Sequence, residues 1–241
     1  MVLRDDSFAT IVMAVAQGRV VFNNIGRFIV YMPSGDSGEI FAVGLVALLD
    51  AALPLLPLQI LYIHIITDVV PALALGIGRG ENTLDQPARD PKQPILDRRH
   101  WLASGGYGLL IGGSVLAVFA YCLLSLGMSQ ERAVTISFIS FAVARLWHVF
   151  NMRDAGYHPL RNTVTTNPRV WGAMATAIIL VAAALYVPIL ASVLKTVDPG
   201  PDGWLLIALG STARLVIGQL LERQALRNAV PERLSGLVGQ R

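Results

Sequence analysis

The sequence predicts an all-α membrane protein, a six-transmembrane-helix bundle with an N-terminal amphipathic stalk. The 241 residues are 54% hydrophobic and only 15% charged, with a mean hydropathy of +0.57, whereas a soluble domain has roughly 25% charged residues. Uncharged runs long enough to cross a bilayer, which takes about 20 residues per helix, recur along the chain. Open strands would leave unpaired backbone groups in lipid, so each run is predicted to be helical.

The six predicted spans are residues 28–49, 53–76, 101–126, 133–152, 170–194 and 204–221. Apolar side chains ahead of the first span recur every three to four residues, which indicates an amphipathic helix that runs into the membrane. We therefore expect residues 1–27 to form a cytosolic stalk, residues 28–222 the membrane domain and residues 223–241 a cytosolic tail.

The distribution of basic residues predicts the orientation. Of the 19 Lys and Arg residues, 15 lie before the first span, in the loops after the second and fourth spans, or after the sixth. Only Arg132 and Lys195 lie in the opposite loops. Because basic residues concentrate in cytoplasmic loops, we expect a multi-pass protein of the cell membrane, in contact with the lipid bilayer, with both termini cytoplasmic. The net charge of +3 is small, and we expect no nucleic-acid partner.

The first two spans carry acidic side chains. Asp36 and Glu39 are three residues apart, and His64, Thr67 and Asp68 lie within four residues of one another, so each set shares one face of a helix. The short connection between the two spans makes them antiparallel neighbours. A carboxylate inside hydrocarbon is costly unless it is paired, hydrated or bound to an ion. We therefore predict a cation site between these helices.

Backbone features of the same spans support this prediction. Pro71 has no N–H, so the Thr67 carbonyl is expected to lose its helical partner and to become an oxygen ligand. Pro33, Gly35 and Gly38 are expected to loosen the first helix in the same way. Hard cations such as calcium bind several oxygens from carboxylates, carbonyls and hydroxyls.

Other interpretations of these polar residues remain open. The acids would form structural ion pairs if Arg145 or Arg214 reached them. His64 would ligate a transition metal such as manganese, act as a pH sensor, or be a hydrogen-bonded core residue. Arg145, His148 and Asn151 form a polar stripe on the fourth span, expected beside the site. Arg145 would neutralise an acid, extend to the membrane surface, or pair with a carbonyl.

Two further patterns concern packing. Gly108 and Gly112 form a GxxxG motif, which predicts close contact between helices. Tyr62, Trp101 and Trp204 fall near span ends, where aromatic residues anchor helices at the membrane interface.

At these residues the chain resembles the C-terminal half of P-type cation-transporting ATPases of the calcium-pump type. Residues 1–12 resemble the end of the phosphorylation domain, 28–39 the fifth membrane helix, 58–76 the sixth, 86–96 the loop after it, and 147–153 the eighth. The stretch 58–76, which contains Ile-Ile-Thr-Asp-Val-Val-Pro, is the most specific of these. The resemblance implies membrane helices five to ten of such a pump.

The resemblance also implies the ligand set. Glu39, Thr67 and Asp68 match the ligands of the family, whereas Asp36 and His64 stand where the family has amides. The implied cation is calcium, with manganese, sodium or protons as alternatives. The additional eighth-helix glutamate of two-site calcium pumps has no counterpart in residues 153–156, which read Arg-Asp-Ala-Gly.

In such pumps the phosphorylated aspartate motif, the nucleotide domain and the first four helices precede the matching region. The sequence contains no Asp-Lys-Thr-Gly-Thr, so we expect ATP and magnesium to act only through those other domains. The chain would then not be catalytic on its own, as a truncated gene product or as the partner of a separate N-terminal half. The alternative is a non-catalytic membrane module or a passive cation pathway that is not coupled to ATP.

Overall fold

The computed structural model describes residues 8–69, 71, 74, 98–151 and 165–212, and every regular element among them is helical. In chain order these elements are α1 (Phe8–Leu48), α2 (Pro57–His64), the π-helical turn η1 (Ile65–Val69), α4 (Arg98–Leu124), α5 (Gln130–His148), the 3-10 turn η2 (Val149–Asn151), α6 (Pro168–Tyr186) and α7 (Pro188–Leu194). Residues 200–212 add a further helical segment. The predicted all-α class is confirmed.

Within the described ranges, three helices are long and apolar enough to cross a membrane: Phe8–Leu48, Ser104–Leu124 and Pro168–Tyr186. The shorter apolar helix Pro57–Val69 combines α2 with η1. The three long helices have 41, 21 and 19 residues, so each reaches or nearly reaches the roughly 20 residues that a bilayer requires. These elements are those of a membrane bundle, as the composition predicts.

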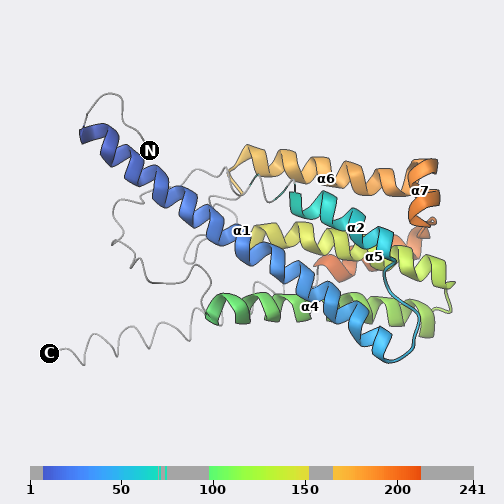
Figure 1. The fold of residues 1–241 in the computed structure, drawn as a ribbon. Helices are drawn as coiled ribbons and strands as arrows, with labels where there is room; N and C mark the ends of the chain where they lie inside the picture. The colour runs from blue at the N-terminus through green and yellow to red at the C-terminus, as the bar shows by residue number, and fades with distance from the viewer. Residues whose placement is uncertain (1–7, 70, 72–73, 75–97, 152–164, 213–241) are drawn as a thin grey trace.

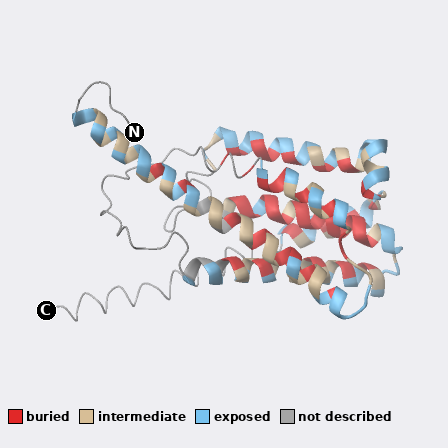
Figure 2. Cartoon of the chain, viewed as in Figure 1, coloured by how far each residue is buried: buried red, intermediate tan, exposed pale blue. Residues whose placement is uncertain are grey.

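Helix α5 forms the centre of this bundle. It packs against α4, α6 and η1, and Figure 1 shows α4 and α6 on either side of it, with α1 crossing the bundle diagonally. Most of its side chains are buried, among them Phe138 and Phe141. Figure 2 shows buried residues concentrated along this helix, whereas the first turns of α1 are mainly exposed. The position of α5 places its polar residues inside the bundle.

The stalk and the first span form one continuous helix of 41 residues, α1. Pro33 lies inside it without interrupting it, so the predicted loosening is not a break. The Ser37 hydroxyl instead donates a hydrogen bond to the Pro33 carbonyl, a common local contact of serine in helices. The apolar side chains Phe8, Val15 and Ile25 of the stalk are exposed.

Glycines allow α1 and α4 to approach closely, as the GxxxG motif predicts. A Cβ added at Gly38 would lie 2.9 Å from the Gly108 carbonyl oxygen and 3.3 Å from the Gly112 nitrogen. A Cβ at Gly112 would collide with the Gly38 carbonyl. The two backbones therefore touch at these positions, and Gly38 serves helix packing rather than loosening α1.

The predicted fifth span, residues 170–194, is divided in the structure. Helix α6 ends at Tyr186, Val187 is extended with φ −86° and ψ 113°, and α7 begins at Pro188. Proline disfavours the helical conformation of the residue before it, which explains the break at this position. In Figure 1, α7 turns across the end of α6 rather than continuing it.

Several predicted features lie outside the described residues. They are the loop 79–96, residues 153–156, Arg214, the second half of the sixth span and the tail 223–241.

The glycine contact between α1 and α4 yields a stability prediction. Gly112→Ala places a methyl group against the Gly38 carbonyl, so we expect a loss of about 1–3 kcal/mol in the free energy of unfolding, typical of overpacking. Thermal unfolding in detergent measures the change. Gly113→Ala is the matched control, because a Cβ there meets nothing within 4 Å. Equal stability of the two variants would contradict the contact.

Candidate cation site

The predicted ligand residues come together where α1 meets the end of α2. Asp36 and Glu39 lie on α1, and His64 is the last residue of α2. His64 Nε2 lies 3.0 Å from Glu39 Oε2 and 3.6 Å from Asp36 Oδ1. Asp68 follows in η1, one turn further along. The antiparallel arrangement expected from the short connection therefore brings both acidic faces together.

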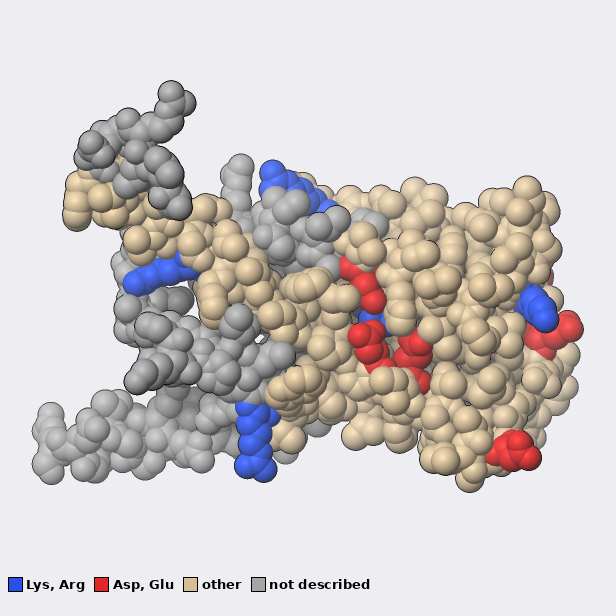
Figure 3. Space-filling view, viewed as in Figure 1, with Lys and Arg blue, Asp and Glu red and all other residues tan. Residues whose placement is uncertain are grey.

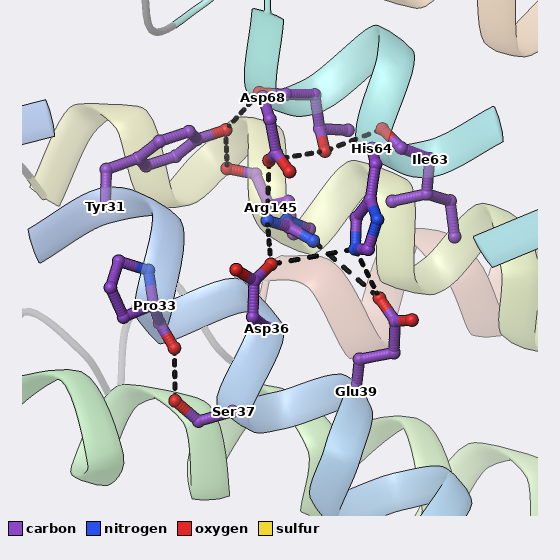
Figure 4. Close-up of polar contacts among 10 residues, drawn as sticks. Tyr31, Pro33, Asp36, Ser37, Glu39, Ile63, His64, Asp68 and Arg145 are labelled. Atoms are coloured by element: carbon purple, nitrogen blue, oxygen red, sulfur yellow. Dashed lines mark hydrogen bonds and ion pairs between the residues drawn. The ribbon is translucent and has the colours of Figure 1, made fainter. Parts of the chain in front are cut away.

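Arg145 of α5 lies among these acids. Its Nη2 donates to Asp68 Oδ1 over 2.5 Å and to Asp36 Oδ1 over 3.0 Å, and its Nη1 lies 3.8 Å from Glu39 Oε2. Figure 4 shows the guanidinium between the Asp68 and Asp36 carboxylates. Arg145 is only 1% exposed, which excludes the alternative that it extends to the membrane surface. Of the uses weighed for Arg145, the structure shows the pairing with acids.

Gly35 provides the space for this guanidinium. A Cβ at Gly35 would collide with the Nε and Cζ atoms of Arg145, so the side chain lies directly over the α1 backbone. Among the residues that the structure describes, Nε and Nη1 of Arg145 have no hydrogen-bond partner. The cluster is therefore held by charge as much as by hydrogen bonds, and Nη1 remains within reach of Glu39.

The cluster carries an excess of negative charge. Asp36, Glu39 and Asp68 contribute three formal negative charges and Arg145 contributes one positive charge, so two negative charges remain when His64 is neutral. Burial of uncompensated charge is unfavourable in a membrane protein. The arrangement therefore favours the binding of further positive charge.

The cluster opens on one side. The side chains of Asp36 and His64 are 41% and 39% exposed, whereas those of Glu39 and Asp68 are 9% and 7% exposed. Figure 3 shows acidic groups gathered around a basic group in a hollow midway along the surface, apart from the other charged groups of this view. A ligand would reach the buried carboxylates past Asp36 and His64.

The geometry is compatible with a single bound ion. Asp36, His64 and Asp68 each offer one ligand atom, and these atoms lie within 4.8 Å of one another. Calcium binds oxygens at about 2.3–2.6 Å, so ligand atoms on opposite sides of one ion are roughly 5 Å apart. The spacing of these three side chains therefore fits one ion, which would share the Asp36 and Asp68 oxygens with the Arg145 guanidinium.

The η1 turn presents Thr67 and Asp68 to the cluster. The Thr67 hydroxyl lies 2.9 Å from the Ile63 carbonyl and 3.2 Å from Asp68 Oδ1, as a donor shared between them. π-helical turns of this kind occur frequently at functional sites. Pro71 follows the turn, and its missing N–H accounts for the irregular backbone there.

The Thr67 carbonyl is not a vacant ligand in this structure, contrary to the expectation from Pro71. The Tyr31 hydroxyl of α1 donates to it over 2.8 Å, and the Arg145 carbonyl lies 3.4 Å from the same hydroxyl. The sequence pattern did not predict a role for Tyr31. Its place on α1, one helical turn before Gly35, put it on the correct face, but its partner is a backbone carbonyl, which residue spacing does not reveal.

Of the predicted polar stripe Arg145, His148 and Asn151, only Arg145 is seen to contact the acids of the site. Arg145 joins the acids, whereas the ring of His148 stacks on Tyr31, with centroids 5.9 Å apart. The side chain of Asn151 lies outside the described residues. Tyr62, predicted as an interface anchor, donates a hydrogen bond over 2.8 Å to the Leu180 carbonyl of α6.

Comparisons with known proteins identify the family of the chain. Residues 52–223 match the family model described as "Cation transporting ATPase, C-terminus". The chain belongs to the P-type cation-transporting ATPases. One such ATPase, the calcium-transporting ATPase of Bacillus subtilis (strain 168), is 34% identical over 228 residues, which cover 93% of this chain and 25% of the relative. The chain thus spans about a quarter of the length of that cation-transporting ATPase, and the predicted resemblance is confirmed.

The ion pairs of Arg145 yield a second stability prediction. Arg145→Met leaves the buried Asp68 carboxylate without its cation, and breaking one partner of a buried pair costs about 3–5 kcal/mol in the free energy of unfolding. Adding Asp68→Asn to this variant should recover part of the loss, because Asp68 is then no longer a buried charge without its partner. Thermal unfolding in detergent of the single and double variants measures both effects.

Arg132→Met is the matched control for that experiment. Arg132 lies on the same helix and donates to the Pro199 carbonyl over 2.9 Å, so its loss should cost about 1 kcal/mol, as for a single hydrogen bond. Two results would show that the guanidinium does not stabilise Asp68. One is that Arg145→Met destabilises the protein no more than Arg132→Met does, and the other is that the double variant is less stable than Arg145→Met.

Proposed function

We propose that this chain forms the membrane part of an ATP-driven pump through which a cation is translocated. The ligands in this proposal are Asp36, Glu39, His64, Thr67 and Asp68. The observation that carries it is the convergence of acidic side chains from α1 and from the end of α2 on one hollow with a surplus of negative charge. Acids gathered inside a membrane bundle mark ion pathways in general.

Calcium is the cation that we propose. Three carboxylates and the Thr67 hydroxyl offer the oxygen ligands that a hard divalent cation requires, and the relative from Bacillus subtilis is a calcium-transporting ATPase. The imidazole of His64 is a softer ligand, which makes manganese the next alternative. Sodium and protons are further alternatives, since each needs less charge than the cluster offers.

The charge of the cluster supports one divalent ion. The guanidinium of Arg145 neutralises one of the three carboxylates through Asp68 and Asp36. The two remaining negative charges balance a single calcium ion, whereas a second would leave two positive charges uncompensated. We propose one ion per site, with Arg145 as a fixed part of the charge balance.

The energy for transport would come from domains of the pump outside these 241 residues. We propose that the N-terminal part of the pump, with its first four membrane helices and its phosphorylation and nucleotide domains, supplies the ATP and magnesium chemistry. Helix α1 runs without a break from Phe8 to Leu48 and carries Asp36 and Glu39, so a displacement of its first turns would move both carboxylates. Both termini would face the cytoplasm.

The experiment joins the chain with the part of the pump that carries the phosphorylation domain and measures calcium-stimulated ATP hydrolysis. Asp68→Asn removes one charged ligand and the partner of Arg145. We expect at least a tenfold increase in the half-saturating calcium concentration, which corresponds to about 1.4 kcal/mol of binding free energy.

Asp50→Asn is the matched control. Asp50 is exposed, and its positive φ of 51° suits asparagine as well as aspartate, so calcium dependence should remain that of the unsubstituted protein. If the half-saturating calcium concentration of Asp68→Asn is unchanged, Asp68 is not a ligand of the ion. Calcium flux across liposomes that contain the chain alone, without ATP, would instead favour a passive pathway.

A further inference from the structure

His148 is a buried imidazole that takes no direct part in the cation cluster. It is 3% exposed, and its Nε2 has no hydrogen-bond partner among the residues that the structure describes. An unpaired polar atom in the interior is destabilising relative to an apolar atom of the same size. The contacts of its ring indicate what the residue does.

The imidazole lies between two tyrosines from different helices. It is stacked on Tyr31 of α1, with ring centroids 5.9 Å apart and an angle of 18° between the planes. It is tilted against Tyr107 of α4, at 4.6 Å and 53°. Aromatic pairs at these separations have preferred geometries, so His148 of α5 fixes the lateral position of the Tyr31 ring.

Tyr31 in turn holds the turn that carries two proposed ligands. Its hydroxyl donates over 2.8 Å to the Thr67 carbonyl, which the nearby Pro71 leaves without an α-helical donor. Thr67 and Asp68 are both buried in η1. A single side chain therefore connects α1 to η1 beside the carboxylate that pairs with Arg145.

We propose that His148 is a positioning residue for the cation site and acts through Tyr31. The stacked imidazole keeps the Tyr31 hydroxyl in line with the Thr67 carbonyl, and this bond holds η1 where Thr67 and Asp68 face Asp36 and Glu39. The expected effect of His148 on cation binding rests on the proposed function. The contacts from His148 to Tyr31 and from Tyr31 to Thr67 exist without any cation.

The connection is tested first by hydrogen–deuterium exchange of the amides in residues 63–69, measured on the protein without calcium. Tyr31→Phe removes the hydroxyl and keeps the ring, and His148→Leu removes the stacked ring and keeps an apolar side chain of similar size. Both should speed exchange in η1 by about tenfold, the effect of losing one hydrogen bond. His148→Phe retains a ring and should exchange as the unsubstituted protein does.

Tyr62→Phe is the matched control. It removes a tyrosine hydroxyl that donates to a backbone carbonyl over the same 2.8 Å, but that carbonyl belongs to Leu180 of α6. The rate of amide exchange in η1 should therefore be the same in Tyr62→Phe as in the unsubstituted protein. If Tyr62→Phe and Tyr31→Phe alter η1 equally, or if His148→Leu leaves it unaltered, the positioning role is overturned.

The second readout is the calcium dependence of ATP hydrolysis in the complete pump. Tyr31→Phe and His148→Leu should each raise the half-saturating calcium concentration about three- to tenfold with little change in maximal rate, and the double variant should be no worse than either single one. Independent, multiplying effects would overturn the proposal, because residues acting through one contact are not additive. A general loss of folding would instead lower the maximal rate.

The two proposals fail in different ways. If the unsubstituted pump shows no calcium dependence, the assigned function fails, while the exchange data still decide whether His148 positions η1. If calcium dependence is present and the His148 and Tyr31 variants match Tyr62→Phe, only the positioning role is overturned.

Discussion

The arrangement of α1, η1 and α5 depends on one guanidinium buried among carboxylates. Arg145 pairs with Asp36 on α1 and with Asp68 in η1, so one side chain of the central helix connects the other two. Buried ion pairs add little net stability, because desolvation offsets their attraction. Their effect is on geometry, since each separated charge would be left unpaired inside the bundle.

Small residues make this arrangement possible. Gly35 leaves room for the guanidinium above the α1 backbone, and Gly38 allows contact with Gly108 and Gly112 on α4. Gly35 and Gly38 are therefore small for different reasons: Gly35 accommodates a side chain of α5, and Gly38 accommodates the backbone of α4. Asp36 and Glu39 each directly follow one of these glycines in the sequence, so the packing of α1 on its neighbours sets their positions.

The sequence was sufficient to predict the helical class, the neighbouring first two spans and the convergence of their acids. Each of these follows from periodicity, from hydropathy or from the high energy of charge in lipid. It was not sufficient for contacts made to backbone atoms. The bonds from Tyr31 to Thr67 and from Tyr62 to Leu180 have partners of no particular residue type, so no pattern predicts them.

The two prolines Pro33 and Pro188 show another limit of prediction from sequence, because the same residue type has different effects on the helix at the two positions. Pro33 remains inside an unbroken helix, whereas Pro188 starts a new one after an extended residue. Both prolines lack the same N–H, yet the chain before Pro33 is helical whereas Val187 before Pro188 is extended. A proline in a single sequence therefore does not show whether a helix continues through it.

The length of α1 has a geometric consequence. At about 1.5 Å per residue, its 41 residues extend for roughly 60 Å, twice the thickness of about 30 Å of a bilayer's hydrocarbon interior. Even at a tilt of about 40° the rod is longer than the lipid interior is thick, so one end projects beyond the lipid. Asp36 lies 28 residues after Phe8, or about 42 Å along the axis, so a small tilt applied at the projecting end acts on the carboxylate with a long lever arm.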